Sequence, residues 1–313
     1  MAKQPILNDS DAEATKTPAE EPKSPKVLGW YEAIQAGDDV ALDKAVVEEV
    51  TKIIKTHQLE NYETLFLFDE KDSISYYHSD RLYAAASNEK NEKKDILLIL
   101  HSNGGSIEPA YLISKALKRL SKNKFVVAVP RRAKSAATLI SLGADEIHMG
   151  LNSQLGPIDP QVGGLPALAV GNALDVIADL VSRFPASANM LTNYLTAQIP
   201  IQSLGYYQRI SESAVQYAER LFAGRQLGDK REPKEVAKCL VNEYKDHGFV
   251  IDIDEAINLL GNKIIQSNSA EYKAADEIYK FLDVVDLFLR PKDKYFWYVG
   301  AVQDGILIRP RRK

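Results

Sequence analysis

The sequence predicts an α/β protein with a largely parallel sheet and a mainly helical C-terminal half. Compact apolar runs at 64–69, 95–100, 125–130 and 145–150 alternate with segments of helical periodicity. Such alternation is typical of right-handed β-α-β units. Near-continuous Ile, Leu and Val runs are typical of parallel strands buried on both faces. The 313 residues are 45% hydrophobic, enough for one large domain or two modest ones.

Three regions are expected along the chain. Residues 1–27 are rich in Pro, Ala, Glu and Lys, a composition that predicts a disordered arm without a secretory signal. Residues 28–290 are expected to form the α/β domain, which begins with helix in the stretch 29–58 and is mostly helical after residue 168. Residues 291–313 are expected to form a terminal hairpin around QDG, followed by a basic tail.

Composition excludes several classes of function. A net charge of −4 gives no clustered basic face for nucleic acid. The single cysteine, Cys239, rules out an internal disulfide and a cysteine zinc cluster. No cluster of His, Asp and Glu has metal spacing, so we expect neither a metal nor a cofactor. No apolar stretch reaches about 18 residues, so we expect no membrane span and a cytoplasmic protein.

The first loop that could take part in binding or catalysis is HSNGGSIEP (101–109), which follows the apolar run at 95–100. Ligands of open parallel sheets bind at the carboxyl ends of the strands. Two adjacent glycines allow a sharp turn that aims backbone N–H groups outward. An oxyanion hole, a phosphate cradle and a purely structural turn all fit this pattern, although the lysine of a P-loop is absent.

The second loop, AKSAATLISLGA (133–144), follows the next predicted strand. Ser135 at the start of a helix fits either a helix cap or a nucleophile favoured by the helix dipole. Small neighbours such as Ala136 allow close approach of a substrate backbone. The two loops follow successive strands of one sheet, so we expect them to face one crevice, the geometry that acyl transfer requires.

These motifs also carry a family resemblance. SNGGSIEPAYLISKAL and AKSAATLISLGADEIHMGLNSQLGPIDPQ resemble the glycine loop and the nucleophile helix of the Clp proteolytic subunit and of signal peptide peptidase. The chain resembles most the serine dehydrogenase proteinase family of the Clp-protease/crotonase-like superfamily, over roughly residues 60–262. The resemblance implies a ββα spiral core and a homo-oligomer that acts on peptide or protein substrates.

Residue by residue, the resemblance implies Ser135 as nucleophile, with the N–H groups of Gly105 and Ala136 as oxyanion donors. The rest of the glycine loop is then the expected substrate-binding strand: Gly104, Ser106 and Ile107.

The general base is harder to assign, because no histidine occupies the loop that follows the predicted helix after Ser135. We favour His247, oriented by Asp159, since triads are defined by geometry and not by chain order. Asp159 alone is a weaker candidate at its usual pKa of about 3.9. Lys134 adjoins the serine, but consecutive helical residues face apart. Asp159 as a turn cap and His247 as a helix-end partner remain open.

The other histidines are assigned more ordinary places. His101 ends a predicted strand and is a candidate to line the crevice, whereas His148 is expected to be packed on a strand. His57 and His78 are expected at the surface.

The leading functional hypothesis is a serine hydrolase of the peptidase type. A crotonase-like acyl-CoA enzyme is one alternative, because that architecture holds a thioester enolate with two backbone N–H groups. A catalytically inactive scaffold subunit is another, and the missing loop histidine favours it.

Overall fold

The computed structural model describes residues 29–87, 93–162, 164–167, 169–198 and 201–311, so the predicted arm 1–27 lies outside the described residues. Its centre is a sheet of order β11-β10-β1-β2-β3-β5-β9. The strands of this path are β1 (Tyr62–Asp69), β2 (Asp95–Ser102), β3 (Phe125–Ala128), β5 (Glu146–Met149), β9 (Ile265–Ser267), β10 (Lys294–Ala301) and β11 (Leu307–Pro310).

Strands β1, β2, β3, β5 and β9 run parallel, which confirms the predicted sheet. Two short strands, β4 (Arg132–Ala133) and β6 (Gln154–Leu155), branch from the carboxyl end of β2. A separate two-stranded ribbon is formed by β7 (Gln161–Val162) and β8 (Leu165–Pro166). These two-residue strands are too short to leave a periodic signal in the sequence.

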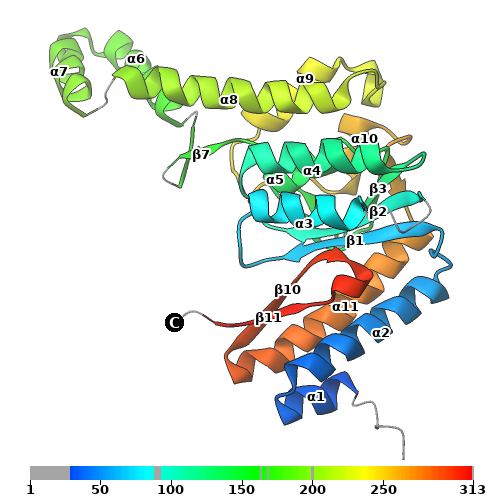
Figure 1. Ribbon diagram of the computed structural model, residues 1–313. Helices are drawn as coiled ribbons and strands as arrows, with labels where there is room; N and C mark the ends of the chain where they lie inside the picture. Colours follow the sequence, from blue (N-terminus) through cyan, green and yellow to red (C-terminus); the bar gives the residue numbers. More distant parts are fainter. Residues whose placement is uncertain (1–28, 88–92, 163, 168, 199–200, 312–313) are drawn as a thin grey trace, which may run out of the picture.

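Helices cover both faces of the sheet (Figure 1). One face carries α3 (Tyr76–Ala86), α4 (Ile107–Leu120) and α5 (Ala136–Leu142), and the other carries α1 (Trp30–Ala36), α2 (Asp39–Thr56) and α11 (Ala270–Leu289). Side chains of β1 point alternately to the two faces of the sheet. Leu65 and Leu67 pack in the first core, under α3, α4 and α5, whereas Phe66 and Phe68 pack in the second core, under α1, α2 and α11.

The predicted N-terminal helix is two helices. Gly37 has left-handed φ (71°) and ends α1, and the Asp38 side chain then accepts hydrogen bonds from the N–H groups of Val40 and Ala41 to begin α2. A glycine in the left-handed region and an aspartate at the N-cap are strong stop and start signals.

The predicted C-terminal hairpin is present as β10 and β11, but it is also part of the central sheet. β10 pairs antiparallel with β1, with Leu65 opposite Ala301 and Phe68 opposite Tyr298. The buried ring of Tyr298 stacks on Phe66 with centroids 4.1 Å apart. The last strand therefore completes the second core.

The second half of the chain is mainly helical, as predicted. It contains α6 (Ala169–Arg183), α7 (Ala188–Gln198), α8 (Ile201–Phe222), α9 (Pro233–Lys238) and α10 (Ile253–Leu260), with a π-helical turn at Cys239–Glu243 and short 3-10 turns at Pro185–Ser187, Gly228–Lys230, Arg290–Lys292 and Val302–Asp304. Helices α6 and α7 extend away from the sheet as an arm (Figure 1).

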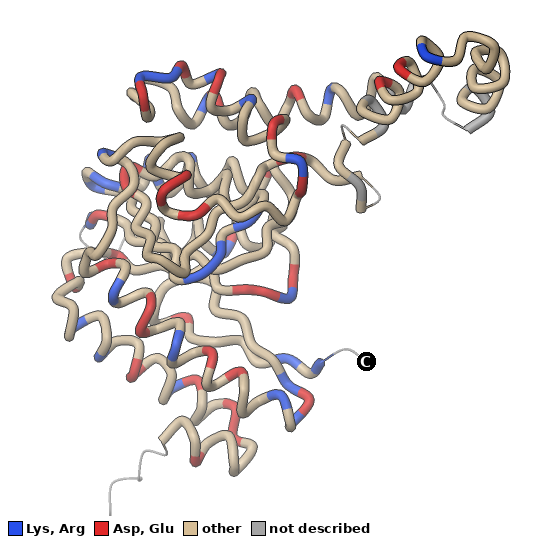
Figure 2. The backbone as a smooth tube through the Cα atoms, turned by 180° about the vertical axis from the view of Figure 1, so that it is seen from behind, with Lys and Arg blue, Asp and Glu red and all other residues tan. Residues whose placement is uncertain are grey.

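Charge is distributed unevenly between the arm and the body. Few charged residues lie on the arm, whereas α2 and α11 carry both signs interspersed (Figure 2). The sequence of α7, ANMLTNYLTAQ, has no charged residue at all. In the described ranges, no helix is both long enough and apolar enough to cross a membrane.

Candidate active site

Ser135 lies at a sharp turn between β4 and α5. It is the N-cap of α5, with φ 51° and ψ −119°, a conformation that is costly for a residue with a side chain. The turn is held on both sides. Lys134 N–H donates to Ser102 O at 3.0 Å, and Thr138 Oγ1 donates to Ala133 O at 2.6 Å. The half-buried serine side chain consequently opens into a cleft of about 610 Å³.

The glycine loop forms one wall of this cleft. Gly104 and Gly105 have φ of 103° and 153°. A Cβ on Gly104 would lie 2.8 Å from Ser135 Cβ, and one on Gly105 would lie 2.2 Å from Ile74 N. The chain can therefore pass between the serine turn and residue 74 only because neither position has a side chain.

Two backbone N–H groups in the cleft are left without a protein acceptor. Among the described residues, no carbonyl or side-chain oxygen accepts from Gly105 N–H or Ala136 N–H. Ala136 is the first residue of α5, where helical N–H groups have no partner within the helix. Both residues line the same cleft as Ser135, together with the predicted substrate-binding residues Gly104, Ser106 and Ile107.

His247 and Asp159 are brought together. Asp159 Oδ1 lies 2.7 Å from His247 Nδ1, although the two residues are 88 positions apart. The hydrogen bond to Asp159 raises the pKa of His247 above its ordinary value, against the opposing effect of burial. Gln161 Nε2 donates to the other oxygen of Asp159, Oδ2, at 2.7 Å. Asp159 is only 7% exposed, whereas His247 is half-buried and lines the cleft.

Backbone pairing holds these two loops in register. Leu155 and Ile251 exchange hydrogen bonds of 2.9 and 3.2 Å, and Ile158 N–H donates to Leu240 O at 2.9 Å. Asp159 thus follows a segment fixed to the π-helical turn, and His247 precedes a segment fixed to β6. Predicting this contact from sequence depends on the resemblance, because no local pattern links the two loops.

Lys134 faces away from the serine hydroxyl, as predicted. Its Nζ donates to Leu155 O at 3.0 Å and to Phe249 O at 2.9 Å, so it joins β6 to the His247 loop. Burial lowers the pKa of Lys134. No lysine occurs from residue 135 to residue 229, and Lys230 is exposed in a 3-10 turn.

One wall of the cleft is not predicted by the sequence motifs. The loop after β1 contributes Glu70, Lys71, Asp72 and Ser73, and Ile210 of α8 also lines the cleft. The loop could have been predicted to line the cleft, because it follows the carboxyl end of a predicted parallel strand. No sequence feature placed Ile210 there, because it belongs to a helix far along the chain.

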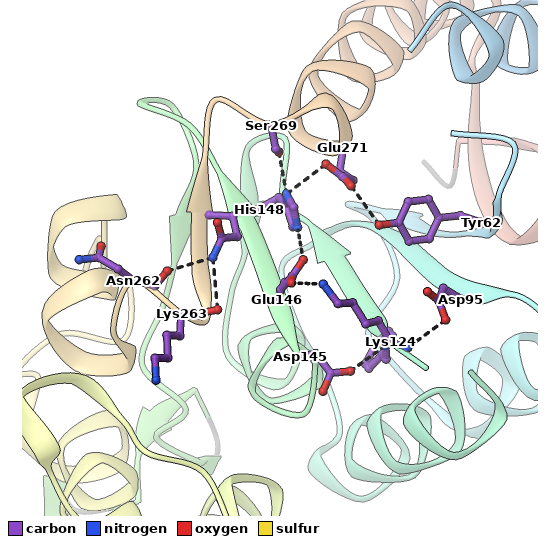
Figure 3. A network of polar contacts seen from close by, with 12 residues as sticks. Tyr62, Asp95, Lys124, Asp145, Glu146, His148, Asn262, Lys263, Ser269 and Glu271 are labelled. Carbon is purple, nitrogen blue, oxygen red and sulfur yellow. Dashed lines mark hydrogen bonds and ion pairs between the residues drawn. The ribbon is translucent and has the colours of Figure 1, made fainter. Parts of the chain in front are cut away.

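The remaining histidines lie outside the cleft lining. His101 is fully buried and hydrogen-bonded to Glu70, behind the wall that it was expected to line. His148 is packed, as predicted, in a polar network with Ser269, Glu271 and Glu146 (Figure 3). The surface position expected for His78 was wrong, since it is 2% exposed. Its side chain turns inward to Asp69 because the first turn of α3 packs on β10.

Comparison with known proteins agrees with the placement of these motifs. Residues 68–179 match the model of the ClpP-like SDH-type serine proteinase family. Two curated relatives from Methanocaldococcus jannaschii are uncharacterized proteins. MJ0137 is 29% identical over 199 residues, which is 60% of this chain and 59% of that protein. MJ1495 is 43% identical over 79 residues, 25% of this chain and 27% of that protein. The chain thus spans less than two thirds of either relative.

Two solved structures are also similar, each at 15% identity and a TM-score of 0.41. One is a serine-to-alanine mutant of the 1510-N membrane-bound stomatin-specific protease, with 72% of this chain and 85% of that chain covered. The other is a lysine-to-alanine mutant of the same protease in complex with a substrate peptide, with 80% and 88% covered. The family resemblance predicted from the sequence is confirmed where the motifs lie: from residue 68 to residue 179, the chain is similar to the ClpP-like SDH-type serine proteinases.

Proposed function

We propose that this protein is a serine hydrolase of the peptidase type, with Ser135 as nucleophile and His247 as general base. The observation that carries the proposal is the shared cleft. Ser135, the unpaired N–H groups of Gly105 and Ala136, and the carboxylate-bound His247 all line it or face it. Nucleophile, oxyanion donors and base are the three components that acyl transfer needs in one place.

The reaction follows from these groups. Ser135 Oγ attacks the substrate carbonyl carbon while His247 Nε2 takes the hydroxyl proton. The carbonyl oxygen becomes an oxyanion that accepts hydrogen bonds from Gly105 N–H and Ala136 N–H. Collapse breaks the carbonyl–nitrogen bond, and the imidazolium returns its proton to the leaving amine. Water then attacks the acyl-serine by the same route, which regenerates the Ser135 hydroxyl.

Asp159 is proposed to set the tautomer of His247. A carboxylate cannot donate a hydrogen bond, so the 2.7 Å contact places the proton on Nδ1 and leaves Nε2 as the acceptor. The amide nitrogen of Gln161 lies 3.1 Å from the same Nδ1, but its shorter contact of 2.7 Å is to Asp159 Oδ2. Gln161 donates to the same carboxylate and restrains its rotation. Asp159 is therefore an orienting group in this proposal, and the base itself is the histidine.

This arrangement weighs against an inactive scaffold, which was favoured by the missing histidine in the loop after α5. His247 supplies the absent ring from another part of the chain and lies at the cleft that Ser135 lines.

A fluorophosphonate probe tests the assignment. Wild-type protein is expected to be labelled on Ser135, and the Ser135→Ala variant is expected not to be. His247→Gln should be labelled at least about 10³-fold more slowly, because the base is lost. Equal labelling of wild type and Ser135→Ala would refute the nucleophile. No labelling of the folded wild type would favour the scaffold, and micromolar binding of an acyl-CoA would favour the crotonase-like alternative.

The proposal also covers the substrate, the location and the assembly of the protein. We propose a peptide or protein substrate, a cytoplasmic location and self-association of the chain. Exposed apolar side chains on the arm support self-association, among them Phe184, Met190 and Tyr194 at 62–66% exposure. Sedimentation velocity of purified protein tests this part, and a monomer at micromolar concentration would contradict it.

A further inference from the structure

The loop 70–75, which forms one wall of the cleft, is held at its two ends by a buried histidine–carboxylate pair. His78 Nε2 lies 3.3 Å from Asp69 Oδ2, and both residues are 2% exposed. Asp69 ends β1, and His78 lies in the first turn of α3. The pair therefore joins the two ends of the loop 70–75, which has little other regular structure.

Hydrogen-bond roles in this pair are fixed by its neighbours. Ser75 N–H donates to His78 Nδ1 at 3.1 Å, so Nδ1 is an acceptor and the ring proton is on Nε2. Nε2–H then donates to Asp69 Oδ2. The other oxygen, Oδ1, accepts from Lys71 N–H at 2.8 Å and from Asp72 N–H at 2.9 Å. One aspartate and one histidine thus bind three N–H groups of the loop.

The loop in turn holds the glycine strand of the proposed oxyanion hole. Ile74 N–H donates to Gly104 O at 2.9 Å, and Ser106 N–H donates to Ile74 O at 2.9 Å. Gly105 lies between these two bonds, and its own N–H is the one left free. The orientation of that N–H is consequently set by the position of Ile74, one residue before the Ser75 that His78 binds.

We propose that the Asp69–His78 pair is a positioning device for the oxyanion strand, acting on Gly105 through the loop 70–75 and Ile74. This inference rests on the proposed function. Neither residue lines the cleft, so neither is a catalytic residue. The role differs from simple support of α3, because a displaced Gly105 N–H weakens binding of the transition state more than binding of the substrate.

Two variants disrupt the pair and a third preserves it. His78→Leu removes both hydrogen-bonding atoms. Asp69→Asn keeps the size and one acceptor for Lys71 N–H, but it turns an amide donor or an already engaged oxygen toward Nε2–H. His78→Gln keeps an acceptor for Ser75 N–H and a donor for Asp69, since Gln at the third helical position is a natural capping-box residue. His57→Gln is the control for loss of a histidine–carboxylate contact elsewhere, because His57 lies 2.8 Å from Glu277 in a more exposed pair whose residues do not line the cleft.

The first measurement is the rate of fluorophosphonate labelling, together with kcat and KM for p-nitrophenyl acetate. We expect His78→Leu and Asp69→Asn to lower kcat and the labelling rate by about 100-fold with KM nearly unchanged, as for loss of one oxyanion donor. His78→Gln should restore most of the rate, and His57→Gln should match wild type.

The second measurement is hydrogen exchange followed by mass spectrometry, which does not depend on activity. Peptides that contain 70–75 and 104–106 should exchange faster in Asp69→Asn than in wild type, whereas the peptide of β3 should not. A folded His78→Leu or Asp69→Asn protein with wild-type labelling rate would overturn the inference, as would a loss confined to KM. If His78→Leu does not fold, the outcome for Asp69→Asn decides. An unlabelled wild type would instead overturn the proposed function, on which this inference rests.

Discussion

At the scale of single residues, the site depends on positions where a side chain is either strained or excluded. Ser135 adopts a positive φ that is uncommon for a non-glycine residue. Such strain persists only where surrounding bonds over-determine the backbone. Here the bonds are Lys134 N–H to Ser102 O and the first turn of α5. A strained strand-to-helix turn also exposes the nucleophilic serine of α/β-hydrolases.

Gly104 gives the sharpest prediction at this scale. A Cβ there would lie 2.7 Å from Lys134 O and 2.8 Å from Ser135 Cβ, and φ is 103°. Gly104→Ala should therefore push the glycine strand off the serine turn and lower kcat for ester hydrolysis by about 100-fold or more, the effect of losing an oxyanion donor. Gly205→Ala is the control, because Gly205 lies in α8 with no atom within 4 Å of a new Cβ. Wild-type kcat in Gly104→Ala would contradict the tight packing.

The His247–Asp159 contact predicts how activity depends on pH. The hydrogen bond to Asp159 raises the pKa of His247, and only the neutral ring can accept the serine proton. The labelling rate of wild type should thus fall as pH decreases through a pKa above the usual histidine value of about 6.5.

Replacing the carboxylate tests the cause of that shift. In Asp159→Asn the acid limb should move to lower pH, because the charge that stabilises the imidazolium is gone. The plateau rate should also fall by about 10³- to 10⁴-fold, since an amide donor facing Nδ1 favours the wrong tautomer. A rate profile measured between pH 5 and about 9 checks both effects. An unmoved acid limb would show that another group titrates.

At the scale of elements, the strands with continuous apolar runs could be predicted from sequence, and the short ones could not. β2 is buried along nearly its whole length, so Ile and Leu fill it. β9 was not predicted, because only Ile265 of its three residues is buried and the segment therefore has no apolar run. The family resemblance predicted Ser135 and the glycine loop 104–107 as residues of the site. The loop 70–75 could not be recognised, because its hydrogen bonds to Gly104 and Ser106 arise only after the sheet has formed.

Helix α5 depends on a residue outside its own sequence. The guanidinium of Arg225, which follows α8, donates to the carbonyls of Leu142, Gly143 and Ala144 at 2.6–2.9 Å. These carbonyls lie at the C-terminal end of α5, where they have no partner within the helix and where a cation interacts favourably with the helix dipole. Arg225 therefore fastens the segment that follows α8 to the C-terminal end of α5, the helix whose N-cap is Ser135.

Arg225→Ala is expected to lower the free energy of unfolding by about 2–3 kcal/mol, because three half-buried carbonyls lose their donor. Urea denaturation followed by circular dichroism measures this change. Arg220→Ala is the control, because Arg220 is exposed on α8, and it should alter stability by less than about 0.5 kcal/mol. If the two variants proved equally stable, the capping role of Arg225 would be refuted.

At the scale of the whole molecule, two cores share one sheet. The core beneath α3, α4 and α5 supports the cleft, and the core beneath α1, α2 and α11 contains the other face of β1. Because Phe66 and Leu67 point to opposite cores, displacement of β1 disturbs both. The loop 70–75 continues directly from β1, so the cleft depends on the second core as well.

The C-terminal strand is the means by which the second core is closed, and its removal is the test at this scale. β10 buries Tyr298, Phe296 and Val299 and pairs with β1 along residues 65–68. Burial of one such side chain contributes about 1.5–3 kcal/mol, and a whole domain is stable by only about 5–15 kcal/mol. Deletion of residues 291–313 should therefore abolish cooperative thermal unfolding and fluorophosphonate labelling together. A shortened chain that still unfolds cooperatively and reacts with the probe would mean that β1 keeps its place without β10, and that the cleft is built by the first core alone.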